Sequence, residues 1–432
     1  MTHGMKTYLV GGAVRDILMG QAPSDRDYVV TGATPADMEA LGFEQVGKDF
    51  PVFLHPQTRD EHALARIERK TGPGYGGFET AWDGVTLQQD LSRRDLTCNA
   101  MAMDPQTGDL IDPFGGRADI KAKTLRHVSD AFREDPVRVL RVARLSAKLG
   151  FGIAPETVEL GREMVRAGEL DHLTAERVQK ELVKALPQPT PSRFFNALEE
   201  MGALKTLFPE VHALRGQTQP PEHHGEGDAY AHTMMVLDAM RDIAVMGGVT
   251  AIAERKDAPK PDVALECFAA LVHDLGKGVT PKEKLPSHHG HEEAGVPLVE
   301  AMCDRLRLPA AYKRIGAKAA RHHIHVHMTE IMKPGKFASI FRDTGGANHP
   351  YDLAVVARVA LADERGRIYD AAKPYDLHER FTAIMTAVAA VKITDAYTVE
   401  AVRAMPPERI QEQVSQLRTK AAKSARIGFA QR

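Results

Sequence analysis

Two aspartates, Asp25 and Asp27, flank a single arginine and could bind a metal ion together. They lead into the apolar run 28–30, which predicts a β-strand. Alternate residues of a strand point to the same face, so the two carboxylates are expected to converge at the end of this strand. Like charges repel unless they are paired or bound to a cation, and Mg²⁺ prefers carboxylate oxygens. The pair is therefore a candidate metal site, and a solvated turn with capping aspartates is the alternative.

A glycine turn precedes the aspartates. Residues 11–16 follow the apolar run 7–10 and open a helical pattern, so backbone N–H groups there can hold phosphate oxygens. Gly12 and Arg15 are the candidate nucleotide contacts of this turn, although a tight turn without a ligand would look the same. Glu68, in the run 63–69 of alternating hydrophobicity, is the candidate for a third acid, and a glutamate on a surface strand is the alternative. A phosphate grip followed by a carboxylate pair predicts metal-assisted nucleotidyl transfer.

Further motifs in the first half of the chain carry a resemblance to a known family. Five segments resemble, in the same order, the motifs of the bacterial class II tRNA nucleotidyltransferases of the polymerase β superfamily. These segments are residues 11–16, 25–27, 93–99, 134–138 and 173–178. The resemblance implies addition of CCA to the 3′ end of tRNA without a nucleic-acid template, with CTP and ATP as substrates and Mg²⁺ as the cofactor. The histidine-rich second half resembles the HD domain fused to CCA-adding enzymes of the enterobacterial type.

Arginines in these motifs are expected to bind the nucleotide. The resemblance implies contacts for Arg94, Arg141 and Arg144, and guanidinium groups suit this role because they bind phosphate with two parallel hydrogen bonds. Asp95 is positioned to orient the arginines of the 93–94 pair, and Asn99 to support the loop. An exposed cluster of ion pairs is the alternative for Arg93.

Asp135 and Arg138 form the segment from which we predict base selection. Cytosine and adenine both present an amino group beside a ring-nitrogen acceptor, so a carboxylate and an arginine together accept both bases. Guanine and uracil reverse this pattern. The two side chains are three residues apart near a helix start and therefore share a face. A helical salt bridge is the alternative.

A second candidate site combines adjacent and distant metal-ligand types. His273 and Asp274 are neighbours in a His-Asp-Leu-Gly-Lys sequence, and His232 and Asp363 complete the set that the HD resemblance implies. Imidazole and carboxylate together suit Mn²⁺, Ni²⁺, Co²⁺ or Mg²⁺, and such a metal can activate water against a phosphoester. Gly276 permits close helix packing, and Lys277 is a candidate phosphate contact. The resemblance implies 2′,3′-cyclic phosphodiesterase, 2′-nucleotidase and phosphatase activities.

Other histidines lie near this set in the sequence. They could add metal ligands or substrate contacts, or they could lie at the surface, and the sequence leaves both possibilities open. These histidines are His288, His289, His291, His322 and His323.

The type of secondary structure expected from the sequence changes along the chain. Short β-rich runs, such as 7–10, 28–30 and 52–54, alternate with turns up to about residue 112, and helical spacing then dominates, as in 136–149 and 175–186. These patterns predict an α+β head and a helical remainder, and the resemblance implies a polymerase-β-like nucleotidyltransferase head followed by an all-α neck and body and an all-α HD domain. The expected domains are 1–144 for the head, 145–220 for the neck and body, and 221–432 for the HD domain and tail.

Composition places the chain among ordinary globular enzymes. With 432 residues and 43% apolar content, it can bury the cores of two or three domains. No run approaches the roughly 20 apolar residues of a membrane span, so we expect a cytoplasmic protein without a membrane partner. The three cysteines are too few and scattered for a disulfide framework. Partners are expected to be tRNA, CTP and ATP, with a monomer or homodimer as the assembly.

Two loops and two alternative functions complete the expectations. The glycine-rich segment 70–78 is predicted to be a mobile loop, and a plain hairpin loop is the alternative. The resemblance implies that a flexible segment there helps to switch specificity from CTP to ATP. The charged segment 253–262 is predicted to be a surface loop. A poly(A) polymerase or an A-adding enzyme would share the head chemistry. A metal-dependent phosphohydrolase with an inactive head is the alternative from another class.

Overall fold

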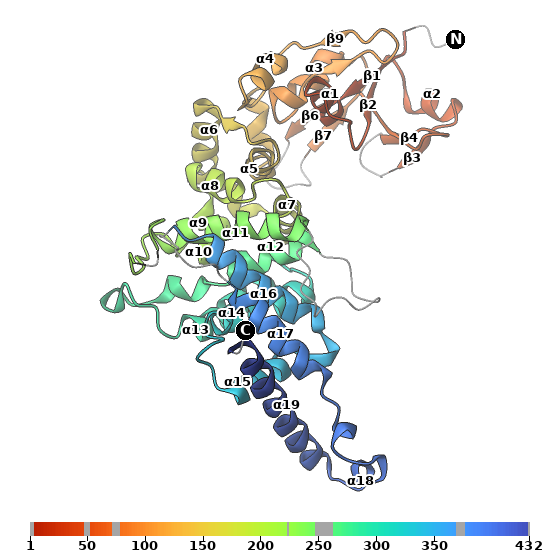
Figure 1. The fold of residues 1–432 in the computed structure, drawn as a ribbon. Coiled ribbons are helices and arrows are strands. Elements are labelled where there is room, and N and C mark those ends of the chain that lie inside the picture. The colour runs from red at the N-terminus through yellow and green to blue at the C-terminus, as the bar shows by residue number, and fades with distance from the viewer. Residues whose placement is uncertain are drawn as a thin grey trace. The chain divides into compact units, whose positions relative to one another are not determined.

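The computed structural model describes residues 4–46, 52–70, 78–222, 224–246, 262–368 and 376–430 (Figure 1). Two compact units divide the chain: residues 1–178 with 193–206 form the first, and residues 179–192 with 207–432 form the second. The division into three domains expected from the sequence is finer than this one, and it stays a prediction. No helix within the described ranges is long and apolar enough to cross a membrane.

A mixed sheet of seven strands forms the centre of the first unit. Its strand order is β3-β4-β5-β2-β1-β8-β9, in which β2 and β5 are parallel and the other neighbouring pairs are antiparallel. The strands are β1 (Lys6–Val10), β2 (Asp27–Thr31), β3 (Glu44–Val46), β4 (Val52–Leu54), β5 (Glu61–Leu64), β8 (Ala102–Met103) and β9 (Leu110–Ile111). The predicted strands 7–10, 28–30 and 52–54 are confirmed as parts of β1, β2 and β4.

Alternation along β1 places side chains on both faces of this sheet. Leu9 packs with Ala13 and Val14 of α1 (Gly12–Leu18), whereas Val10 packs with Leu91 of α3 (Leu87–Ser92). Because both faces are covered, the sheet fixes the positions of the turns at its strand ends.

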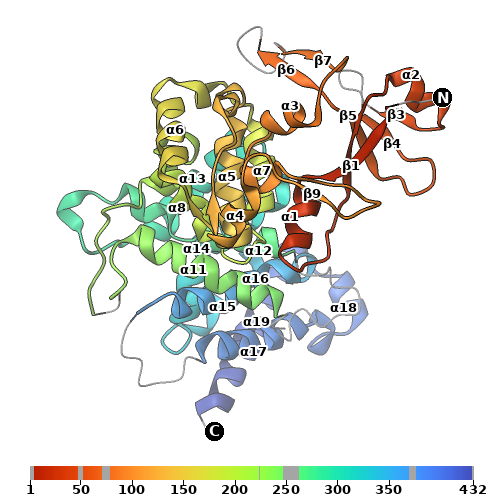
Figure 2. The ribbon, with the colours of Figure 1, turned by 90° about the horizontal axis from the view of Figure 1, so that it is seen from above.

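A separate antiparallel hairpin, β6 (Ile67–Lys70) with β7 (Phe78–Ala81), lies outside the seven-stranded sheet (Figure 2). The alternating run 63–69 is therefore not one strand, because β5 ends at Leu64 and β6 begins at Ile67. The antiparallel pairing is that of a hairpin, and residues 71–77 of the predicted mobile loop lie outside the described residues. Residues 253–261 of the predicted surface loop also lie outside them.

Helices and one short pair of strands form the rest of the first unit. The predicted helix 136–149 is α5 (Val137–Leu149), which ends at Gly150 with a φ of 69°. The predicted helix 175–186 is α7 (Ala175–Ala185), which begins in the first unit and continues into the second. A short parallel pair joins β10 (Thr124–Leu125) to β11 (Gly152–Ile153). The remaining elements are α2 (Pro35–Ala40), η1 (Thr97–Asn99), α4 (Gly116–Lys121), η2 (Asp130–Glu134), α6 (Pro155–Arg166), η3 (Glu169–His172), α8 (Ser192–Glu200) and α9 (Leu204–Leu207).

The described part of the second unit is helical. Its long helices are α11 (Ala229–Val245), α12 (Val263–Val272), α13 (His291–Arg305), α14 (Ala310–His327), α15 (Pro334–Asp343), α16 (Pro350–Arg365), α17 (Leu377–Ala390) and α19 (Pro407–Ala430). Shorter segments connect them: α10 (Pro209–His212), η5 (Leu275–Val279), η6 (Lys282–Lys284), η7 (Gly346–Asn348), η8 (Ile393–Asp395) and α18 (Val399–Arg403). Helix α12 is apolar and buried from residue 264 to its end, and it packs against α11, α14 and α16. This buried helix delivers His273 and Asp274, which follow it, into the interior of the unit.

Candidate active sites

The first candidate site lies where β1 and β2 meet the turn into α1. Asp27 is the first residue of β2 and is paired with Val10, the last residue of β1. Gly11 follows with a φ of 71°, and a Cβ atom there would lie 3.2 Å from Arg94 Nη1 and 3.9 Å from Asp27 Oδ2. Glycine suits this position both for its backbone angle and for the space it leaves between the arginine and the carboxylate.

The strand begins at Asp27, so Asp25 precedes it in a bend. The expectation that both aspartates share one strand face was therefore wrong, because strand geometry does not extend to Asp25. The two charges are nevertheless coupled. Loss of water around its oxygens raises the pKa of Asp27, Arg94 acts against this, and the charge of Asp25 adds to it. Two neighbouring aspartates whose charges repel each other fit a divalent cation, which would relieve that repulsion.

Asp90, which sequence reasoning missed, holds both arginines of the 93–94 pair. Its carboxylate accepts hydrogen bonds from Arg93 Nη2 at 2.6 Å and from Arg94 Nη2 at 3.2 Å. Burial pushes the pKa of Asp90 upward, but the two guanidinium groups outweigh it and hold the pKa below its ordinary value. The sequence did contain a signal for this contact. Asp90 lies in α3, three residues before Arg93 and four before Arg94, and this is the spacing at which side chains meet on one face of a helix.

Asp95 does not orient Arg93 or Arg94 through a described hydrogen bond, contrary to the sequence interpretation. It accepts instead from Arg141 Nε at 2.8 Å, from the Leu96 amide at 2.9 Å and from Asn99 Nδ2 at 3.2 Å. Burial opposes ionisation, yet Arg141 and these hydrogen bonds lower the pKa of Asp95 to about 2. The contact between Asp95 and Arg141 joins the loop that follows α3 to helix α5.

Arg15 is buried and bound within the protein. Its guanidinium donates to Asn99 Oδ1 at 2.6 Å and to Asp16 Oδ1 at 2.6 and 2.9 Å. Gly12 lies directly against it, since a Cβ there would be 3.4 Å from Arg15 Nη2. A phosphate contact by Arg15 would require these bonds to be exchanged, so its nucleotide-binding role and that of Gly12 stay predictions. The expected support of this loop by Asn99 agrees with the two hydrogen bonds of its side chain.

Asp135 and Arg138 lie at the junction of η2 and α5. Arg138 donates to the backbone carbonyls of Ala131 at 2.7 Å and Arg93 at 2.6 Å, so it links this junction to the arginine loop. Asp135 accepts two hydrogen bonds of 2.9 Å from Arg177 on α7. Arg177 belongs to the motif 173–178, but nothing in its spacing pointed to Asp135, which is distant in sequence.

Two remaining residues of the first site keep the status of predictions. Glu68 pairs with Thr80 in the β6–β7 hairpin, and its side chain lies outside the described part of the chain. Arg144 lies on α5, three residues beyond Arg141 and six beyond Arg138, so the three arginines share one helix face.

The second candidate site gathers the predicted His232, His273, Asp274 and Asp363 in the interior of the second unit. All four are buried, with at most 2% of their surface exposed. His232 Nε2 lies 2.9 Å from Asp363 Oδ1 and 3.9 Å from Asp274 Oδ2, and His273 Nε2 lies 3.2 Å from Asp274 Oδ2. His232, His273 and Asp363 could together hold a metal ion.

Hydrogen bonds on the outer side of each ring orient these imidazoles. His232 Nδ1 lies 2.7 Å from Glu226 Oε1, and His273 Nδ1 lies 2.7 Å from the Ala270 carbonyl. Since both partners accept, each Nδ1 carries the proton and each Nε2 presents a lone pair to the centre. The Nε2 atoms of both histidines are buried and have no hydrogen-bond partner among the described residues. Such orphaned lone pairs fit a metal cation.

The two carboxylates of this site are stabilised as anions despite their burial. Burial opposes ionisation, but it is outweighed and the pKa of each carboxyl lies well below its usual range, because the imidazole of His273, when protonated, and Lys277 stabilise the anion of Asp274, and Arg367 and the protonated form of His327 stabilise that of Asp363. Lys277 Nζ lies 2.5 Å from Asp274 Oδ2 and donates to Gln219 at 2.7 Å. Its phosphate-binding role therefore stays a prediction.

The structure separates the histidines that the sequence left open. His291 and His323 point Nε2 toward Asp274 Oδ1, at 3.2 and 3.4 Å. Both nitrogens of His288 are used, by Thr280 Oγ1 and the Thr218 carbonyl. His322 is buried beside His325 instead, with ring centroids 5.5 Å apart, and His289 is exposed. Helical spacing relates His323 to His327, but the sequence did not indicate which imidazoles of the 322–327 run face inward.

Gly276 allows this cluster to close. A Cβ atom there would lie 1.9 Å from the His291 carbonyl and 2.7 Å from the Gly295 amide nitrogen, so the close packing expected of this glycine is confirmed. Sequence reasoning missed two residues that surround the ligands, namely Glu226 and Arg367. His327, the last histidine of the run 322–327 that could add ligands or substrate contacts, lies 2.7 Å from Asp363 Oδ2 through its Nε2.

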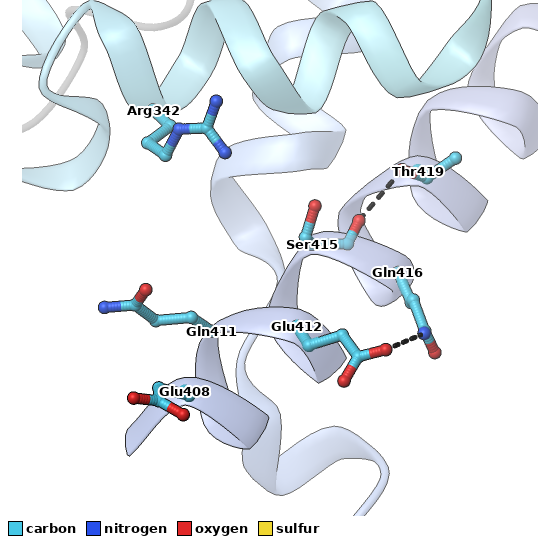
Figure 3. Close-up of a pocket in the computed structure, with 7 residues that line it drawn as sticks. All are labelled: Arg342, Glu408, Gln411, Glu412, Ser415, Gln416 and Thr419. Atoms are coloured by element: carbon cyan, nitrogen blue, oxygen red, sulfur yellow. Dashed lines mark hydrogen bonds between the residues drawn. The ribbon is translucent and has the colours of Figure 1, made fainter.

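A polar hollow of about 510 Å³ lies along α15 and α19 in the second unit (Figure 3). Its lining residues are Arg342, Glu408, Gln411, Glu412, Ser415, Gln416 and Thr419. The hydrogen bonds drawn in Figure 3 run within α19, from Thr419 to the Ser415 carbonyl and from Gln416 to Glu412. None of these residues belongs to either candidate site.

Three family models match the chain in order. The poly A polymerase head domain matches residues 7–126, the model described as "Probable RNA and SrmB-binding site of polymerase A" matches 150–214, and the HD domain matches 229–385. The two candidate sites thus fall mainly in the head and HD matches, while Asp135, Arg138, Arg141 and Arg144 lie between the first two matches.

Relatives named multifunctional CCA protein match most of the chain. The protein of Thioalkalivibrio sulfidiphilus is 51% identical over 86% of this chain and 87% of its own length. That of Nitrosococcus oceani is 46% identical over 98% of both chains. Among solved structures, a CCA-adding enzyme of Bacillus stearothermophilus in complex with CTP is similar at a TM-score of 0.62 and 23% identity, covering 98% of this chain and 90% of that chain. At that identity the likeness establishes the fold alone, and it confirms the predicted fold class.

Proposed function

Because the chain belongs to the family of multifunctional CCA proteins, we propose that it adds CCA to the 3′ ends of tRNA, using CTP and ATP. The observation that carries this proposal for the head is the meeting of Asp27 and Arg94 beside Gly11, with the charge of Asp25 acting on Asp27. This arrangement offers carboxylates for a metal and a guanidinium for a triphosphate in one place. Since these substrates are found in the cytoplasm, we propose that location for the protein.

Asp25, Asp27 and Arg94 would share the work of nucleotidyl transfer, with Glu68 as the proposed third acid. Mg²⁺ held by Asp25 and Asp27 would supply activation of the 3′-hydroxyl and charge neutralisation on the triphosphate. Arg94 would bind the triphosphate, since its Nε is buried without a hydrogen-bond partner among the described residues and Asp90 anchors its Nη2. Arg15, Arg141, Arg144 and the Gly12 amide are proposed as further contacts.

Asp135 and Arg138 would select the base. The Asp135 carboxylate would accept from the exocyclic amine, and Arg138 would donate to the ring nitrogen, which fits cytosine and adenine and opposes uracil and guanine. Two hydrogen bonds from Arg177 hold Asp135, and two backbone carbonyls hold Arg138. Side chains fixed in this way cost little to order when the nucleotide binds.

The second unit is proposed to hydrolyse phosphoesters, including 2′,3′-cyclic phosphodiesters, 2′-nucleotides and phosphomonoesters. His232, His273, Asp274 and Asp363 would hold Ni²⁺, Mn²⁺, Co²⁺ or Mg²⁺, which would supply an activated water. The buried, ionised Asp274 and Asp363 and the inward Nε2 lone pairs support this ligand set.

The primary experiment offers labelled CTP, ATP, UTP and GTP, singly and in pairs, to tRNA transcripts that end before CCA, after C and after CC. We expect two cytidines and one adenosine, followed by arrest. Addition of adenosine to the CC end alone would instead identify an A-adding enzyme, and ladders of adenosine a poly(A) polymerase. No incorporation would favour a phosphohydrolase with an inactive head. Sedimentation of the free protein would decide between the monomer and the homodimer.

A further inference from the structure

Asn99 lies between two arginines that are proposed to contact the nucleotide. Its Oδ1 accepts a hydrogen bond of 2.6 Å from Arg15 Nη1, and its Nδ2 donates one of 3.2 Å to Asp95 Oδ1. Asp95 Oδ2 in turn accepts from Arg141 Nε at 2.8 Å. A continuous series of hydrogen bonds therefore runs from α1, which follows the glycine turn, to α5, the helix that carries Arg138.

The chemistry of its two partners fixes the orientation of the Asn99 amide. A guanidinium group only donates and an ionised carboxylate only accepts, so the amide oxygen faces Arg15 and the amide nitrogen faces Asp95. Asp95 is ionised at neutral pH, because Arg141 and its hydrogen bonds outweigh burial and lower its pKa to about 2. An ionised aspartate in place of Asn99 would lack the donor, and leucine would lack both groups.

Burial makes the loss of any member of this series costly. Arg15, Asp95 and Asn99 are 4%, 6% and 8% exposed. Water therefore has little access to replace a missing partner, and a buried polar group without a partner is unfavourable. Such a network holds its side chains in one arrangement.

The same loop, residues 93–99, is also bound to α5 at a second point. Arg138 Nη2 donates to the Arg93 carbonyl at 2.6 Å, and Arg141 binds Asp95 near the other end of the loop. Asn99 binds the loop to α1. The loop carries Arg94, the proposed triphosphate ligand, so it connects the phosphate end of the proposed nucleotide site to the helix of the proposed base-selecting residues.

We propose that Asn99 is a positioning residue that sets the spacing between the phosphate end and the base end of the nucleotide site. This inference rests on the proposed nucleotide addition. A nucleoside triphosphate contacts both ends at once, and the second contact strengthens the first only when the spacing is correct. Without Asn99, each end still binds its own part of the nucleotide, but one molecule no longer fits both ends. Base selection then weakens, because the base is no longer held against Asp135 and Arg138.

The test compares a whole nucleotide with its phosphate part alone. Titration calorimetry of the full chain with Mg²⁺ measures the dissociation constants of CTP and of inorganic tripolyphosphate. In Asn99→Ala we expect the constant for CTP to rise on the order of tenfold, while that for tripolyphosphate stays close to the wild-type value. The preference of kcat/KM for CTP over UTP should fall by a similar factor.

Asn99→Asp isolates the bond to Asp95. It keeps an acceptor for Arg15 and places a second carboxylate beside Asp95, so we expect it to lose CTP affinity and base preference as Asn99→Ala does. If the added charge prevents folding, judged by the melting temperature, Asn99→Ala alone decides.

Ser146→Ala is the matched control. Ser146 is a buried residue of α5 whose Oγ donates to the Phe151 carbonyl at 2.8 Å, and no hydrogen bond joins it to the series described above among the described residues. Its replacement should lower the melting temperature, as loss of Asn99 should, but leave the ratio of CTP to tripolyphosphate affinity unchanged.

Several results would overturn the positioning role. They are an equal loss of CTP and tripolyphosphate binding in Asn99→Ala, wild-type affinity and base preference in that variant, the same loss of preference in Ser146→Ala, or a wild-type chain that binds tripolyphosphate as tightly as CTP. If the calorimetry gives the expected result but the wild-type chain adds no nucleotide to tRNA, the proposed addition is rejected and the positioning role stands. CCA addition by Asn99→Ala with wild-type preference would give the reverse result.

Discussion

Arg177 on α7 donates two hydrogen bonds of 2.9 Å from a single Nη2 atom to both oxygens of Asp135. The two residues are far apart in sequence, and the contact ties the proposed base-selecting carboxylate to the helix of a different motif. We therefore propose Arg177 as a positioning residue, which would act on the base through Asp135. A carboxylate held by one arginine still has lone pairs for the amino group of a base.

Replacing Arg177 with alanine should relax base selection more than it slows the reaction. Without its partner, Asp135 can turn away from the base, and loss of a hydrogen bond between charged groups costs about 1.5 to 3 kcal/mol. We expect the preference of kcat/KM for CTP over UTP to fall on the order of tenfold or more. Single-turnover incorporation of each nucleotide measures this ratio.

Arg166→Ala is the matched control for that substitution. Arg166 lies on α6 in the same unit, is largely exposed and pairs with Glu159 at the surface. Arg177→Lys should recover part of the discrimination. Equal slowing of all four nucleotides by Arg177→Ala, with no change in their ratios, would contradict the positioning role.

Asp25→Asn and Asp27→Asn should abolish nucleotide addition while leaving phosphoester hydrolysis intact. Each substitution removes a charged ligand from the proposed metal site, and lost electrostatic stabilisation of this kind costs on the order of 10²- to 10³-fold in rate. The measurement is CTP incorporation alongside hydrolysis of a 2′,3′-cyclic phosphodiester. The exposed turn residue Asp109 offers a control as Asp109→Asn. Full incorporation by either test variant would remove that aspartate from the metal site.

The buried Asp95–Arg141 pair predicts an acid-sensitive first unit. The pKa of Asp95 is lowered from 3.8 to about 2, so its contribution is present above the unfolded pKa and is lost as the pH falls through the folded pKa. That contribution is about 2 kcal/mol. Asp95→Asn should therefore destabilise the unit at pH 7, and the difference from wild type should shrink between about pH 4 and pH 2.

Fluorescence of Trp82 can follow this transition, because it is the single tryptophan of the chain and belongs to the first unit. Urea unfolding of wild type and variant at several pH values gives the difference directly. A difference that stays constant down to pH 2 would show that the ionised Asp95 does not stabilise the unit.

Local patterns in the sequence predicted much of the fold. Apolar runs and helical spacing identified β1, β2, β4, α5 and α7, because each element buries a face whose period is visible in the chain. The run 63–69 suggested one continuous strand, because its alternation continues across Ala65 and Arg66. The structure instead places these residues between β5 and β6, which belong to different sheets. Alternation shows which face of a strand is apolar, but it does not show which strand pairs with it, because that depends on residues elsewhere in the chain.

The sites were predictable to a lesser extent. His273 and Asp274 are adjacent and formed a recognisable signal, whereas His291 and His323 reach Asp274 only through the packing of α13 and α14 against η5 and α12. Asp90 and Asp95 illustrate the same limit. Both lie close to Arg93 and Arg94 in sequence, but the fold gives those arginines to Asp90 and pairs Asp95 with Arg141.

Gly276→Ala should destabilise the second unit. The added methyl group would lie within 2 Å of the His291 carbonyl, so either α13 or η5 must move. Overpacking of this kind costs about 1 to 3 kcal/mol or more. Calorimetry should show a lower melting temperature for this unit and weaker Mn²⁺ binding. Gly428→Ala in α19 has open space for its methyl group and serves as the control. Unchanged melting and metal affinity in Gly276→Ala would contradict the close contact.

Glu226→Gln should weaken metal binding without removing a ligand. Glu226 Oε1 lies 2.7 Å from His232 Nδ1 and 2.8 Å from His224 Nδ1, and Oε2 accepts from the Ile368 amide at 3.0 Å. The amide of glutamine keeps one acceptor, so either His232 or the Ile368 amide loses its partner. A carboxylate that fixes a ligand's tautomer raises its basicity, and its loss costs about 10- to 100-fold in metal affinity.

Competition with a fluorescent chelator measures this affinity for Mn²⁺ or Ni²⁺. The exposed Glu222 in the same segment provides the control variant Glu222→Gln, which should bind as tightly as wild type. Because Glu226 lies behind His232, the number of ions bound at saturation should stay unchanged while the affinity falls, which separates its role from that of a ligand. A reduced stoichiometry would make Glu226 a ligand itself, as the group His224, Glu226 and His232 would allow. Unaltered affinity would show that the Ala270 carbonyl and the two aspartates suffice to orient the site.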